Sequence, residues 1–83
     1  MLEASESQPV SGPLKLLSPR ETEVLGLASL GLTNPEIALR LSVTVHAVKF
    51  HLAGIYRKFG VANRTTAVGI YLRELQAQSA ESL

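Results

Sequence analysis

Apolar residues along this chain recur at the three- and four-residue spacing that is typical of amphipathic α-helices. The clearest run falls in residues 45–59, where the apolar positions are Val48, Leu52, Ile55 and Phe59. Thr44 precedes this run as a helix N-cap residue, and Gly60 follows it as a residue that ends helices. We therefore predict a helix from Val45 to about Phe59, with these four apolar side chains in the core.

Three further helices are predicted from their end signals and apolar stripes. The first begins after Ser18, because Ser18-Pro19-Arg20-Glu21 combines an N-cap, a first-turn proline and a glutamate three residues on, and it stops at Gly31. The second runs from Asn34 or Pro35 to Leu41, with Thr33 or Asn34 as its cap. The fourth runs from Arg64 to about Gln76 and is capped by Asn63. No segment alternates with period two for long enough to be a strand, so we expect an all-α, four-helix fold.

Composition sets the bounds of this fold. The chain has 83 residues, enough for one small domain, and we place that domain at residues 14–77. Residues 1–13 are polar and rich in Pro and Gly, which predicts a disordered tail or linker, and residues 78–83 are expected to fray.

The residue types that are missing exclude several classes of function. The chain contains neither cysteine nor aspartate, which excludes a disulfide framework, a phospho-accepting aspartate and a Ser-His-Asp triad. His46 and His51 lie five positions apart on the predicted helix and do not share one face, so no metal site and no cofactor is expected. We expect no enzyme activity, no membrane segment and a cytoplasmic protein.

Charge is distributed unevenly, although the net charge is only +1. Residues 43–69 contain no acidic residue and four cationic residues, which are Lys49, Arg57, Lys58 and Arg64. A short helix, the tight Ser42-Val43-Thr44 turn and a longer basic helix are typical of a domain that places its second helix in the DNA major groove. The sequence therefore indicates a duplex-DNA-binding helix-turn-helix.

The side of the 45–59 helix away from its apolar stripe supplies the candidate DNA contacts. We expect base contacts from Lys49, Phe50, Ala53 and His46, with the apolar Phe50 suited to thymine methyl groups. Gly54 indicates close approach, either of DNA or of another helix. Helix N-termini and flanking cations are expected to contact the DNA backbone; these residues are Thr33, Asn34, Thr44, His51, Arg57, Lys58 and Arg64.

The motifs of residues 16–75 resemble the LuxR-type helix-turn-helix family, which includes the FixJ, NarL and GerE proteins. The similar segments are Leu17-Ser18-Pro19-Arg20-Glu21, Gly31-Leu32-Thr33-Asn34, Val48-Lys49 with His51, and Arg57-Lys58-Phe59-Gly60-Val61 with Asn63-Arg64. The resemblance implies the effector domain of a bacterial transcription regulator of the response-regulator class, which binds DNA through its third helix. The chain departs from the family at Ala47, Phe50 and Ala53, where the DNA-facing surface is unusually apolar.

The resemblance also implies partners. A homodimer is expected on DNA through the fourth helix, with Val68, Tyr71, Leu72 and Leu75 as the dimer face, although Tyr71 and Leu72 also fit a core position. RNA polymerase is a further expected partner. Two alternatives stay open on the sequence: a sigma-factor-like promoter-binding domain, and a helix-turn-helix that has become a protein-interaction module.

Overall fold

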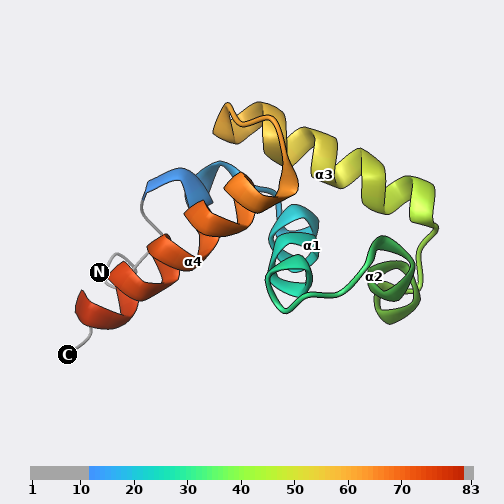
Figure 1. Ribbon diagram of the computed structural model, residues 1–83, viewed down its shortest axis with the longest axis horizontal. Coiled ribbons are helices and arrows are strands. Elements are labelled where there is room, and N and C mark those ends of the chain that lie inside the picture. Colours follow the sequence, from blue (N-terminus) through green and yellow to red (C-terminus); the bar gives the residue numbers. More distant parts are fainter. Residues whose placement is uncertain (1–11, 82–83) are drawn as a thin grey trace, which may run out of the picture.

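The computed structural model describes residues 12–81, which form a short 3-10 helix, η2, and four α-helices (Figure 1). No strand occurs in this part of the chain. The elements in chain order are η2 (Gly12–Leu16), α1 (Pro19–Ser29), α2 (Asn34–Leu41), α3 (Val45–Phe59) and α4 (Arg64–Glu81). The all-α, four-helix prediction is confirmed.

Two capping boxes fix where α1 and α2 begin. The Ser18 hydroxyl accepts a hydrogen bond from the Glu21 amide at 3.1 Å, while the Ser18 amide donates to the Glu21 carboxylate at 2.9 Å. Thr33 and Glu36 exchange the same pair of bonds at 3.3 Å and 2.8 Å. Thr33 is therefore the N-cap of α2, which settles the choice between Thr33 and Asn34.

The turn between α2 and α3 is as short as the sequence predicted. Ser42 ends α2 in the left-handed region, with φ of 59°, and Thr44 caps α3 by accepting a hydrogen bond from the Ala47 amide at 3.0 Å. Gly60 ends α3 with φ of 69°, a conformation that costs glycine little. The residues that terminate each element therefore set the direction in which α3 leaves the turn.

The core gathers side chains from all four α-helices. Val24 and Leu25 of α1, Ile37 of α2, and Val48 and Ile55 of α3 are fully buried, and α4 contributes the buried Ala67. Leu52 belongs to the same cluster, whereas Phe59 is only partly buried against it. The predicted core side of α3 is therefore correct, with Phe59 at its margin.

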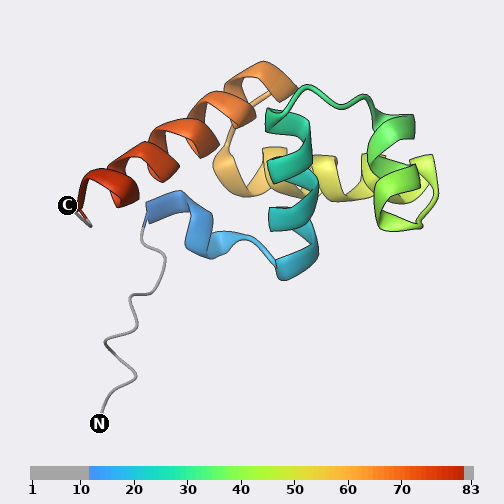
Figure 2. The same ribbon diagram turned by 90° about the horizontal axis from the view of Figure 1, so that it is seen from below.

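The helices are arranged so that one side of α3 is left uncovered. Helix α1 lies in the middle and packs against α3 and α4, and α2 packs against the N-terminal part of α3 (Figures 1 and 2). In Figure 1 α3 lies along the upper edge of the domain with α1 and α2 below it, and in Figure 2, seen from below, α1 and α2 lie in front of α3. The opposite side of α3 is consequently available for a ligand.

The ends of the chain differ from their predicted boundaries. Gly12 and Pro13, which were assigned to a disordered tail, belong to η2, and η2 lies beside α4 (Figure 2). Helix α4 continues past Gln76 to Glu81, through residues that were expected to fray. Helix α4 packs against η2, and Glu74 of α4 lies next to Gly12, a neighbour that the sequence pattern did not indicate. Residues 1–11 and 82–83 lie outside the described part of the chain.

Candidate nucleic-acid interface

The uncovered side of α3 carries the predicted base-contacting residues. Steps of about 100° per residue place this side opposite the buried Val48 and Ile55. Its exposed residues are His46, Lys49, Phe50, Ala53 and Arg57. The structure therefore brings all four residues predicted to face DNA bases onto one accessible surface. Arg57 is also exposed, with its Nη2 atom 3.7 Å from the position that a Cβ atom would take at Gly54.

Phe50 and His51 form an aromatic pair on this helix. Their ring centroids lie 5.6 Å apart with the planes at 72°, an edge-to-face arrangement. Phe50 is 70% exposed, whereas His51 is half-buried. His51 is thus placed to support the phenyl ring from one side.

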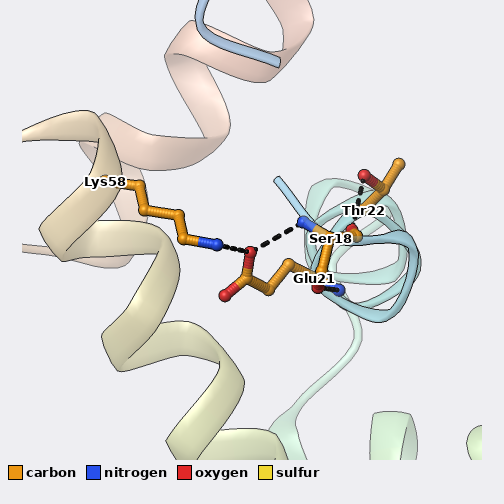
Figure 3. A network of polar contacts seen from close by, with 4 residues as sticks. All are labelled: Ser18, Glu21, Thr22 and Lys58. Atoms are coloured by element: carbon orange, nitrogen blue, oxygen red, sulfur yellow. Dashed lines mark hydrogen bonds and ion pairs between the residues drawn. The ribbon is translucent and has the colours of Figure 1, made fainter. Parts of the chain in front are cut away.

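Lys58 makes an ion pair that the sequence did not predict (Figure 3). Its ammonium donates a hydrogen bond to the Glu21 carboxylate at 2.8 Å, and the same carboxylate oxygen accepts from the Ser18 amide. Glu21 is buried, with an exposed fraction of 8%. Lys58, which was predicted to contact the DNA backbone, therefore also joins the C-terminal part of α3 to the start of α1.

Burial and the contacts with Lys58 and Ser18 act in opposite directions on the pKa of Glu21. Burial raises the pKa of the Glu21 carboxyl, but the hydrogen bonds from Lys58 and Ser18 and the positive charge on Lys58 outweigh burial and hold that pKa below its ordinary value. The carboxylate therefore stays ionised at neutral pH and keeps both contacts.

Gly54 faces this carboxylate and not the uncovered side of α3. A Cβ atom at position 54 would lie 2.6 Å from Glu21 Oε2, and Gly54 is buried. The interpretation that Gly54 permits close approach of DNA is therefore wrong. Gly54 is needed because the Glu21 side chain of α1 occupies the space that a side chain would fill.

Three of the predicted backbone-contacting residues meet at the start of α2. Arg64 Nη1 donates to Asn34 Oδ1 at 2.9 Å, and Arg64 Nη2 donates to the Leu32 carbonyl oxygen. Thr33, Asn34 and Arg64 line one open depression next to Gly31 and Pro35. The sequence predicted a role in DNA backbone contact for each of the three, and it did not predict that Arg64 ties α4 to the turn before α2.

Thr44 is the N-cap residue of α3, just as Thr33 is the N-cap residue of α2. Both hydroxyls are exposed and accept a backbone hydrogen bond, so each retains a hydroxyl hydrogen that it can donate to a phosphate oxygen. These two caps lie at the positive ends of their helix dipoles, where an anion is favoured.

The predicted dimer residues of α4 divide into two pairs. Val68 and Tyr71 are partly buried and pack against the core, and the Tyr71 hydroxyl approaches Gly26 of α1 closely. Leu72 and Leu75 are 48% and 40% exposed. Of these four residues, Leu72 and Leu75 are therefore the two that offer accessible apolar surface on α4.

Other chemistry finds little support in the described residues. Among the side chains of residues 12–79 no three His or Glu lie together as a metal-binding group. Over the same residues no helix combines the length and the apolar character that crossing a membrane requires.

Comparison with known proteins relates this geometry to bacterial regulators. Residues 15–71 match the family described as bacterial regulatory proteins, luxR family. The transcriptional activator protein YukR of Yersinia ruckeri is 49% identical over 53 residues, which is 64% of this chain and 23% of YukR. The probable transcriptional regulatory protein SgaR of Hyphomicrobium methylovorum is 42% identical over 60 residues, which is 72% of this chain and 28% of SgaR.

A solved structure agrees with these relatives. The response regulator ChrA of a haem-sensing two-component system superimposes with a TM-score of 0.63 at 36% sequence identity, and the match covers 92% of this chain and 34% of ChrA. The chain spans about a quarter of the length of the curated relatives it matches. Since the family match covers well over half of the chain, this protein belongs to the luxR family of bacterial regulatory proteins and carries its helix-turn-helix domain.

Proposed function

We propose that this chain binds double-stranded DNA as the effector domain of a bacterial transcription regulator of the LuxR and response-regulator class. Helix α3 enters the major groove of DNA. There the base edges are contacted by four side chains of the helix, His46, Lys49, Phe50 and Ala53. The observation that carries the proposal is the uncovered side of α3, which presents Lys49 and Arg57 with no acidic residue anywhere in the helix. A cationic helix that projects from a compact support suits a polyanion groove about 12 Å wide.

The backbone contacts follow from the flanks of α3. The hydroxyls of Thr33 and Thr44 and the amide of Asn34 bind phosphates at the helix starts. Arg57 contacts the backbone from the uncovered side, and Arg64 does so from the depression beside Asn34. His51 and Lys58 contribute from the other flank, where the Glu21 ion pair reduces what Lys58 offers to DNA.

The regulator acts as a homodimer on DNA. Leu72 and Leu75 are the exposed apolar residues of α4, and pairing two such helices covers surface that otherwise stays in water. Two domains then contact half-sites about one helical turn apart. Transcription control from such a site involves RNA polymerase, and access to the bacterial chromosome requires the cytoplasm.

The first test is a titration of the isotope-labelled chain with a duplex about 20 base pairs long, which offers two helical turns. We expect amide shifts to centre on Thr33, Thr44 and Lys49. Lys49→Gln should weaken binding, whereas Lys15→Gln, which removes the same charge from exposed η2, should not. Shifts confined to α1, or equal effects of the two substitutions, would contradict the groove model.

A protein-interaction module is the second candidate, because large apolar side chains are exposed on α2, on α3 and at the end of α1. Leu39 of α2 is 82% exposed, Leu30 after α1 is 72% exposed, and Phe50 is 70% exposed. Absence of any duplex-induced shift at low salt would favour this candidate. The match to the luxR family favours DNA binding over it, and also over a sigma-factor-like domain.

A further inference from the structure

Phe50 is an unusual residue for the centre of a DNA-facing helix surface. It is 70% exposed on the uncovered side of α3, where it directly follows the exposed Lys49 in the chain. The core does not require it, since the buried face of α3 is formed by Val48, Leu52 and Ile55. Its ring makes an edge contact with the half-buried His51. On the side of α3 that is proposed to face DNA, an exposed phenyl ring fits a ligand that offers an apolar group.

The chemistry of the major groove restricts what such a ring can recognise. Base edges there present hydrogen-bond donors and acceptors, which a phenyl ring cannot pair with, and one apolar group, the C5 methyl of thymine. Ala53, one turn further along α3, is small and exposed, so it adds apolar surface without keeping the helix away from the bases. His51 restricts the ring on the other side.

We propose that Phe50 is a specificity-determining residue that recognises the C5 methyl group of a thymine in each half-site. This inference rests on the proposed function, because it requires α3 to lie in the major groove. Lys49 and Arg57 then supply affinity for phosphates and base acceptors, and Phe50 supplies discrimination through a contact that carries no charge. The discrimination is consequently insensitive to salt, unlike the total affinity.

The test removes the methyl group and nothing else. Duplexes that bind the 83-residue chain are first selected from a randomised library, and each thymine of the selected site is then replaced by deoxyuridine. We expect one thymine in each half-site to be sensitive, with about fourfold weaker binding, since burial of a methyl-sized group is worth about that factor. The same replacement should have almost no effect on Phe50→Ala, which completes a double-mutant cycle.

Matched controls distinguish a specific effect of the Phe50 ring from the general effect of removing an exposed apolar side chain. Leu39→Ala removes an exposed apolar side chain from α2, away from the uncovered side of α3, and should keep the full sensitivity to deoxyuridine. Phe50→Ala should unfold at the same temperature as the parent chain, because the ring lies outside the core cluster.

The outcomes distinguish this inference from the proposed function. If no sequence is enriched from the library, the proposed function fails and this inference fails with it. If a site is enriched but deoxyuridine weakens binding of the parent chain and of Phe50→Ala equally, or of neither, then DNA binding stands and Phe50 does not recognise a methyl group.

Discussion

Glu21 completes the capping box of α1 and forms an ion pair with Lys58, and the local sequence predicts only the capping box. The spacing from Ser18 to Glu21 predicts the capping box, because both partners lie within one helical turn. The ion pair with Lys58 joins residues 37 positions apart, so no local pattern indicates it. Gly54 belongs to the same contact, and its role was correspondingly open on the sequence between DNA and a neighbouring helix. Residues that serve non-local contacts are those that the sequence could not assign.

Substitution of Gly54 tests this contact. Alanine normally stabilises a helix interior by roughly 1 kcal/mol over glycine. At position 54 the new Cβ would displace the Glu21 carboxylate, which sits 2.6 Å away and is held by Ser18 and Lys58. We therefore expect Gly54→Ala to lower the free energy of unfolding by about 1 kcal/mol, the scale of a lost cap. Gly69→Ala is the matched control, since nothing lies within 4 Å of its Cβ, and it should stabilise. Equal gains at both positions in urea unfolding would contradict the account.

Ionisation of Glu21 makes the stability depend on pH. The pKa of Glu21 is lowered in the folded state, so its contribution is complete above the unfolded pKa, about 4.3, and is lost as the pH falls through the folded value. Thermal unfolding between pH 7 and pH 3 should show this loss, and Glu21→Gln should be less stable at pH 7 and show a shallower decline. Glu23→Gln, on the exposed side of α1, is the control and should keep the parent profile. An unchanged decline in Glu21→Gln would show that other carboxyl groups control it.

At the scale of elements, local signals predicted helix positions well and helix neighbours poorly. Caps at Ser18 and Thr44 and the stop at Gly60 act within a turn, so the boundaries of α1 and α3 follow from them. The end of α4 lacks such a signal, so the sequence predicted an end near Gln76, whereas the helix continues to Glu81. The same division applies to the site: exposure on α3 follows from helical spacing, whereas the Arg64 and Lys58 contacts depend on how helices pack.

Substitution of the two adjacent cations Arg57 and Lys58 should therefore change DNA affinity and folding stability to different degrees. Arg57 is exposed and has no ion-pair partner within residues 12–79, whereas Lys58 is paired with Glu21. Arg57→Gln should reduce the slope of log affinity against log salt by about 0.9, the value for one phosphate contact, with unchanged stability. Lys58→Gln should reduce the slope less and lower the free energy of unfolding. Binding measured from 50 to 200 mM salt, beside urea unfolding, compares them; identical slopes and stabilities would remove the distinction.

At the scale of the whole molecule, the surfaces proposed for DNA and for a second copy lie on different helices, α3 and α4. The domain measures 41 × 24 × 22 Å, and α4 extends along its length away from α2 (Figure 1). The uncovered side of α3 and the exposed Leu72 and Leu75 lie on separate elements, so the proposed contacts with DNA and with a second copy do not compete for one surface. Tyr71 and Val68, in contrast, hold α4 to the core.

Substitution of Leu72 should consequently weaken dimer formation on DNA, whereas substitution of Tyr71 should first affect folding. Leu72→Glu introduces a charge on the exposed side of α4, so it should leave the unfolding temperature and single half-site affinity unchanged. Its affinity for a duplex with two half-sites should fall about tenfold, because the apolar contact between copies is worth on the order of 1–2 kcal/mol. Tyr71→Glu should instead lower the unfolding temperature, because the ring packs against α1 beside Gly26. If Leu72→Glu binds two half-sites as tightly as the parent chain, the second copy contacts another surface, and α4 beyond Tyr71 serves only to hold η2.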